Sequence, residues 1–457
     1  MTDADRSATL YAACLGELGQ LGNQLFQYAF ALAYTSTWKL RLCTPVWVGS
    51  FIFEGADPHT RGPSLPMAES RIILADRVVL SHAGWKRWAE RREPLASIVR
   101  DNAGASLSGR KLRQECPQVN AASIASQQNE RACTGCGHVE ACVARGGCLE
   151  LWGFFQFHTR QLAPHRPLLV RALRPIGAVR QLVEAVLGEL RTETAAAHGV
   201  ETREVTLVCV HVRCKDDVLP LCGGDGSGSG GTSAYRPCEH NHAGADVKWR
   251  RPQGPAAVPA DGPHAPSRAA SSVGEGDAPA DASVDLPSEW RDEGVFWAAP
   301  VQWHVEWLRR LWPTLRAPTL LLCTDHAERA LNSGLCEFAP TLLPSRLREQ
   351  ASLWEAAHVA CGHELTDGAL EMVADWEAMR RADVLAINQS TFSFTAAMAA
   401  ATAEGGEVAV EPAREPTRPR WWRPDPMAGA LVSFEPWDSP VLLNACESGT
   451  EFRKRSD

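Results

Sequence analysis

The chain has 457 residues, of which 45% are hydrophobic and 22% charged, the balance of an ordinary globular protein. This composition excludes a wholly disordered chain, a collagen and a coiled coil. The net charge is −8, so nothing indicates a nucleic-acid partner. No run of about 18 apolar residues occurs, so no membrane-spanning helix is expected.

The first predicted unit is a strand, a glycine turn and a helix. Residues 10–15 form a short apolar run, and Gly16, Gly19 and Gly22 interrupt the chain after it. Apolar residues then recur at spacings of three and four from Asn23 onward, which predicts a helix with Asn23 as its N-cap. Such a turn lets the backbone approach a bound group closely, although an ordinary capped turn would have the same sequence.

A segment with a cysteine cluster follows. Residues 101–148 lack strong periodicity and are expected to be an irregular insertion, with a cluster at Cys133, Cys136, Cys142 and Cys148. One C-x-x-C pair could begin a zinc site, but the second pair is spaced more widely than in a zinc ribbon. Disulfides and reduced thiols without a metal stay open as alternatives.

From residue 177 onward, predicted helices and strands alternate. Helices are expected at 177–198, 301–311, 372–381 and 391–403, and strands at 205–212, 319–323 and 384–387. Residues 223–288 hold too few large apolar side chains to offset the entropy of ordering, so we expect a disordered insertion there. The alternation predicts an α/β fold with a parallel sheet covered by helices on both faces.

Polar residues follow the predicted strands, at the edge where open parallel sheets bind their ligands. His211 and Arg213 end one strand, and Thr324 and Asp325 follow the next. Arg213 can hold a phosphate oxygen with two hydrogen bonds at any working pH. A surface turn with mixed charges is the alternative interpretation.

The third strand end opens directly into a helix. Ser390, Thr391 and Ser393 bring hydroxyls and free backbone N–H groups to that helix N-terminus, which favours a phosphate group. Helix capping alone would also explain these residues.

In order and in spacing, these motifs resemble the α-1,2-fucosyltransferase family. The family's motifs read roughly G-x-L-G-N-Q-M-F-Q-Y-A, G-Y-F-Q, H-x-R-R-x-D, S-D and N-S-S-F-S-W-W-A-A. Their counterparts here are, in the same order, residues 20–31, 153–156, 211–216, 322–325 and 388–397. The resemblance covers most of residues 14–403 apart from the two insertions, and it extends more loosely to α-1,6- and protein O-fucosyltransferases.

The resemblance implies the GT-B arrangement, with two facing Rossmann-like domains and a cleft between them. An acceptor-side domain would span residues 10–165, a GDP-fucose-binding domain residues 166–403, and a tail residues 404–457. The implied activity is a galactoside 2-α-L-fucosyltransferase, which moves fucose from GDP-fucose to a glycan hydroxyl with inversion. Neither a metal ion nor another cofactor is implied.

The resemblance also implies roles for single residues. Arg213 would neutralise the β-phosphate as GDP departs, while Gly22 and Asn23 would close over the donor near the fucose. Asp216 and Glu17 are the candidate general bases. The other implied donor-binding residues are His211, Thr324, Asp325, Ser390, Thr391, Phe392 and Ser393.

The chain departs from the family at two positions of these motifs. Cys214 stands where the family has a second Arg, and Phe394-Thr395 where it has a Trp pair. A nucleotide-sugar or glycan binder without turnover therefore stays open, as do another linkage and an interaction protein built on the cysteine cluster. The family implies the Golgi in eukaryotes, but no leader or anchor is visible, so a cytoplasmic location also stays open.

Overall fold

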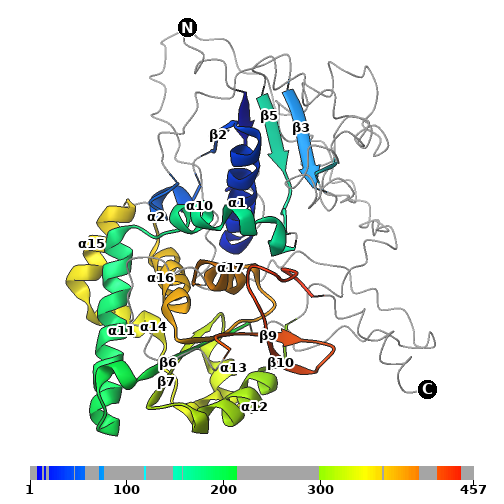
Figure 1. The fold of residues 1–457 in the computed structure, drawn as a ribbon. Coiled ribbons are helices and arrows are strands. Elements are labelled where there is room, and N and C mark those ends of the chain that lie inside the picture. The colour runs from blue at the N-terminus through cyan, green and yellow to red at the C-terminus, as the bar shows by residue number, and fades with distance from the viewer. Residues whose placement is uncertain are drawn as a thin grey trace, which may run out of the picture.

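The computed structural model describes eleven stretches of the chain and contains two five-stranded sheets with helices packed on them (Figure 1). The described residues are 8–12, 15–16, 20–45, 47–56, 71–76, 118–119, 148–156, 158–213, 298–362, 365–400 and 419–443. The predicted α/β class with mostly parallel strands is confirmed. Among the helices described, none combines the length and apolar character needed to span a bilayer.

The first sheet is built from the N-terminal third of the chain, and its strand pairs are parallel. Its order is β2-β1-β5-β3-β4. The strands are β1 (Thr9–Tyr11), β2 (Arg41–Cys43), β3 (Arg71–Asp76), β4 (Gln118–Val119) and β5 (Cys148–Trp152). Because β4 lies within residues 101–148, the segment expected to be irregular contributes a short strand to this sheet.

Helices α1 (Leu21–Trp38) and α2 (Gly49–Ile52) belong to this part of the chain. Two 3-10 turns, η3 (Thr159–Gln161) and η4 (Ala163–His165), then lead through α10 (Arg166–Ala172) to the long helix α11 (Gly177–His198). The bounds of α11 are those predicted, because its apolar residues lie on one face and Gly199, with φ 63°, ends it.

The second sheet has the order β10-β9-β8-β6-β7. Its strands are β6 (Thr206–Val212), β7 (Pro318–Thr324), β8 (Val384–Ala386), β9 (Trp421–Asp425) and β10 (Ala430–Ser433). The first four are parallel, and β10 is an antiparallel edge strand. Strands β9 and β10 come from residues 404–457, so the segment set apart as a tail completes this sheet.

Helices cover both faces of the second sheet, as the alternation predicted. The remaining helical elements are α12 (Val301–Leu311), η8 (Trp312–Thr314), α13 (Ala327–Asn332), η9 (Leu335–Phe338), α14 (Leu343–Glu349), α15 (Ala351–Cys361), α16 (Asp367–Arg381) and α17 (Thr391–Ala400). Val208 and Val210 of β6 pack with α12 and α13, whereas Leu207 and Cys209 pack with α16 and α17. Alternate residues of a strand point to opposite faces, so burial of both faces explains the unbroken apolar runs of β6 and β7.

One core cluster joins the two sheets through α1 and α17. It includes Leu10 and Leu149 of the first sheet and Leu207 of the second. Between them, the rings of Phe26 on α1 and Phe394 on α17 lie 6.0 Å apart. In Figure 1, α17 lies directly below α1, between the two sheets.

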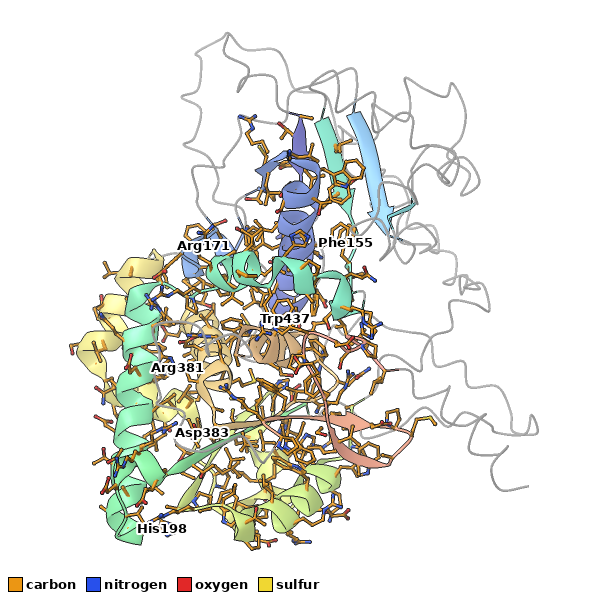
Figure 2. All side chains as sticks on the ribbon, viewed as in Figure 1. Phe155, Arg171, His198, Arg381, Asp383 and Trp437 are labelled. Atoms are coloured by element: carbon orange, nitrogen blue, oxygen red, sulfur yellow. The ribbon has the colours of Figure 1, made fainter. Side chains whose placement is uncertain are left out.

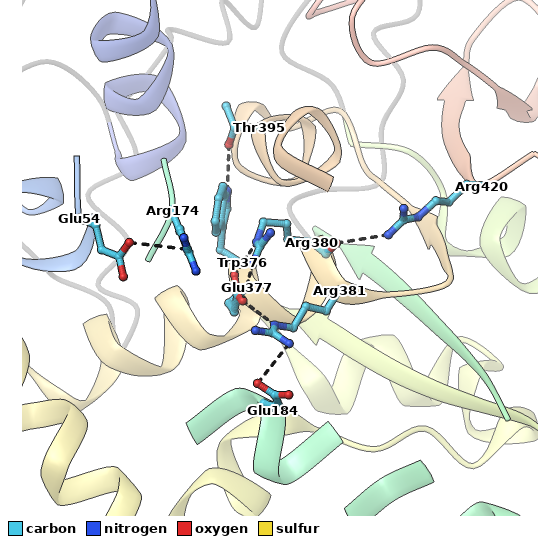
Figure 3. A network of polar contacts seen from close by, with 9 residues as sticks. All are labelled: Glu54, Arg174, Glu184, Trp376, Glu377, Arg380, Arg381, Thr395 and Arg420. Carbon is cyan, nitrogen blue, oxygen red and sulfur yellow. Dashed lines mark hydrogen bonds and ion pairs between the residues drawn. The ribbon is translucent and has the colours of Figure 1, made fainter. Parts of the chain in front are cut away.

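A polar network anchors α16 beside this core (Figure 3). The carboxylate of Glu377 is fully buried and accepts hydrogen bonds of 2.6 Å from Nε of both Arg380 and Arg381. Arg381 also lies 3.6 Å from a carboxylate oxygen of Glu184 on α11. On the neighbouring residue, Trp376, the indole N–H donates to Thr395 Oγ1 of α17 at 3.1 Å. The network therefore ties α16 to α11 and α17.

Residues 434–443 return from β10 toward the first half of the chain. The indole N–H of Trp437 donates to the carbonyl of Met398 on α17 at 3.0 Å, and Figure 2 labels this ring beside that helix. Two residues later, the carbonyl of Ser439 accepts from both the N–H and the hydroxyl of Thr159. This segment therefore bonds to α17 and to the η3 turn.

Candidate functional site

The carboxyl ends of β6, β7 and β8 meet at one edge of the second sheet. Val212 pairs with Thr324, and Val210 pairs with Ala386, so the residues that follow each strand lie at the same level. The helices that follow β6 and β8, α12 and α17, cover opposite faces of the sheet. Between two such neighbouring strands, open α/β sheets form a ligand-binding crevice.

The first half of the chain reaches this edge through the first turn of α1. Helix α1 begins at Leu21 with Gln20 as N-cap, and no side chain caps it. The prediction of Asn23 as the N-cap is therefore wrong. Its Oδ1 instead accepts hydrogen bonds from Gln156 Nε2 at 2.7 Å and from Thr391 Oγ1 at 3.0 Å. Local sequence could not reveal this, because both partners are far from Asn23 in the chain.

Gly22 brings the first turns of α1 and α17 into direct contact. A Cβ at this position would lie 2.4 Å from the backbone nitrogen of Phe392 and 2.7 Å from Thr391 Oγ1. Neither helix has an acidic residue in its first turn. Because the N-terminal end of a helix carries partial positive charge, the meeting of two such ends favours an anionic ligand.

His211 faces the start of α17 from the end of β6. Its Nδ1 lies 2.9 Å from the hydroxyl of Ser393, and its ring meets that of Phe392 edge-on at 5.9 Å. Burial lowers the pKa of His211 to about 4; the charge of Asp325 opposes this shift and that of Arg213 adds to it. The imidazole is therefore neutral at pH 7, with one nitrogen as donor and the other as acceptor.

Two buried polar residues at this edge were not predicted as site residues. His304 on α12 is fully buried, next to the backbone of Pro300 and Ile387. Burial lowers its pKa to about 4. Asn388 is 1% exposed; its Oδ1 accepts from the N–H of Gln389 at 2.6 Å, while its Nδ2 has no partner in the described part of the chain. Asn388 lay within a motif, whereas nothing in the sequence singled out His304.

The predicted donor-binding residues lie together at this one edge. They are Gly22, Asn23, His211, Arg213, Thr324, Asp325, Ser390, Thr391, Phe392 and Ser393. Their roles stay predictions. Both candidate bases, Glu17 and Asp216, lie outside the described residues.

The described residues contain no group of three or more His, Cys, Asp or Glu side chains placed to hold a metal ion. Of the predicted alternative zinc site, Cys133, Cys136 and Cys142 lie outside the described residues, and only the backbone of Cys148 is described. The state of that cluster and the metal-independence of the site therefore stay predictions. The insertion at residues 223–288 also lies outside the described residues.

Comparison with known families and proteins gives no assignment: no family model matches the chain, and no curated protein matches its sequence. The resemblance therefore rests on the motifs themselves and on their positions in the fold.

Proposed function

We propose that the chain is a fucosyltransferase of the GT-B type, which moves fucose from GDP-fucose to a hydroxyl of a glycan, with a terminal galactoside as the foremost acceptor. One observation carries the proposal. Four motifs that are far apart in the sequence, at residues 22–23, 211–213, 324–325 and 390–393, lie at one edge of the second sheet. Two mostly parallel sheets, joined through α1 and α17 at that edge, support the GT-B arrangement.

The chemistry of the edge suits a nucleoside diphosphate sugar. Two helix ends and the guanidinium of Arg213 supply positive charge for a diphosphate. The hydroxyl of Ser390 and the backbone N–H groups at the start of α17 supply donors, whereas the hydroxyl of Thr391 donates to Asn23. In the proposed reaction, an acceptor hydroxyl attacks C1 of fucose, and the bond from C1 to the β-phosphate oxygen breaks. GDP leaves with the bonding electrons, Arg213 stabilises its charge, and Asp216 or Glu17 takes the proton of the hydroxyl.

The test is release of GDP from GDP-fucose with a panel of galactosides, without added metal. We expect release to require an acceptor and to persist in EDTA. Arg213→Ala should reduce kcat/KM at least about 100-fold, because a charge-assisted contact to the leaving group is lost. Arg310→Ala removes an exposed arginine on the solvent side of α12 and should leave the rate unchanged.

Other outcomes decide between the alternatives. Tight binding of GDP-fucose without turnover on any acceptor would favour a nucleotide-sugar binder, and the replacement of the family's second Arg by Cys214 is the observation behind that candidate. Absence of donor binding would contradict both.

A further inference from the structure

The side chain of Asn23 is held by residues of both halves of the molecule. Its Oδ1 accepts from Gln156 Nε2 at 2.7 Å and from Thr391 Oγ1 at 3.0 Å. Two donors on one carbonyl oxygen fix which end of the amide faces them. The Nδ2 group therefore points away from Gln156 and Thr391, and no residue in the described ranges accepts a hydrogen bond from it.

The backbone before Gln156 has an unusual conformation, which places Gln156 next to Asn23. Gly153, just after β5, has a φ of 151°, and Phe155 has a φ of 52°. A bulky residue in the left-handed region costs about 1–2 kcal/mol and persists only where its surroundings enforce it. Here the ring of Phe155 is 1% exposed and stacks on Phe30 with centroids 4.4 Å apart. This stack fixes the turn that directs Gln156 toward α1.

We propose that Gln156 is a positioning residue, which together with Thr391 holds the carboxamide of Asn23 so that its Nδ2 donates to the sugar of the bound donor. The inference rests on the proposed function and adds a specific role to it. Gln156 itself does not contact the substrate. Its hydrogen bond orients the carboxamide of Asn23 so that Nδ2, the donor, faces the ligand. Its loss should weaken binding of the sugar and leave binding of the nucleotide unchanged.

The test compares binding of GDP-fucose with binding of GDP by calorimetry. In Gln156→Glu, the new carboxylate can only accept hydrogen bonds. The carboxamide of Asn23 must therefore rotate by about 180° to donate to it, which presents Oδ1 instead of Nδ2 to the ligand. We expect the Kd for GDP-fucose to rise about tenfold more than the Kd for GDP, because the lost hydrogen bond to the sugar adds to the repulsion that the new charge exerts on either ligand. Asn23→Asp keeps both accepted bonds but replaces the donor, so it should likewise weaken binding of GDP-fucose more than binding of GDP.

Two controls separate this role from charge and from folding. Gln181→Glu makes the same substitution on an exposed position of α11 and should change neither Kd. Gln156→Met removes the donor without adding charge and should again weaken only GDP-fucose, about threefold. Thermal melting should show all four variants folded.

The outcomes are distinguishable. Equal weakening of GDP and GDP-fucose in Gln156→Glu, or no change in either, would overturn the positioning role while leaving the proposed function intact. A wild-type chain that binds neither ligand would overturn the proposed function and this inference with it.

Discussion

Burial, more than charge pairing, sets the protonation of the two histidines near the site. His211 and His304 both have their pKa lowered to about 4, with loss of hydration as the largest cause. Their surroundings differ, because His211 has the hydroxyl of Ser393 within hydrogen-bonding distance, whereas hydrogen bonding to the backbone of Ile387 and Pro300 opposes the shift at His304. A buried histidine that resists protonation makes the stability of the fold depend on pH.

We therefore expect His304→Leu to make the protein less sensitive to acid. A histidine whose pKa is lower in the folded state loses stability as the pH falls from about 6.5 toward 4. The variant escapes this loss, so its stability relative to the parent protein should rise by about 2 kcal/mol between pH 7 and pH 5.

The measurement is urea unfolding of both proteins between pH 4 and pH 8. Taking the difference between them cancels the titration of every group that they share. His198→Gln changes an exposed histidine at the end of α11 and should give a nearly constant difference over the same range. A difference for His304→Leu that does not grow on acidification would contradict the assignment.

At the scale of elements, α16 depends on one buried carboxylate. Glu377 is fully buried between Arg380 and Arg381, whose side chains are 13% and 15% exposed. Its position three and four residues before the two arginines places all three groups on one side of the helix. Removing one partner of a buried ion pair leaves the other charge uncompensated.

Glu377→Gln should therefore destabilise the fold by roughly 2–4 kcal/mol, measured as a lower midpoint of urea unfolding. Glu355→Gln removes a carboxylate from an exposed position of α15 and should change stability by less than about 0.5 kcal/mol. Equal effects of the two substitutions would show that the network around Glu377 does not contribute to the stability of the fold.

At the scale of the whole molecule, the two halves approach each other closely at Gly22. Because a Cβ there would lie 2.4 Å from the backbone of Phe392, Gly22→Ala must move α1 away from α17. We expect at least about tenfold weaker binding of GDP-fucose, since the edge contributed by both helices is disrupted, together with a lower melting temperature.

Gly188→Ala is the matched control. A Cβ at Gly188 meets nothing within 4 Å, and the residue lies inside α11, where Ala is favoured over Gly by about 0.5–1 kcal/mol. It should raise the melting temperature slightly and leave donor binding unchanged. If Gly22→Ala behaved in the same way, the contact between the helices would not matter for the site.

The local periodicity of apolar residues sufficed to predict the positions of most helices and strands of the second sheet. The bounds of α11 and α12 agree with the predicted ranges 177–198 and 301–311, and β6, β7, β8, α16 and α17 lie where they were expected, with ends differing by a few residues. Amphipathic helices and doubly buried strands each have a pattern that depends only on nearby residues. The same reasoning failed at Asn23, whose partners are more than 130 residues away.

The sequence by itself determined the α/β class, the order of the strands along the chain and the motifs that follow them. Only the tertiary structure decided that β9 and β10 complete the second sheet and that Asn23 is held by Gln156 and Thr391. It also decided that His304 and Asn388 are buried at the same edge. The physical reason is that propensity and periodicity act over a few residues, whereas strand pairing, burial and side-chain hydrogen bonds depend on which distant segments pack together.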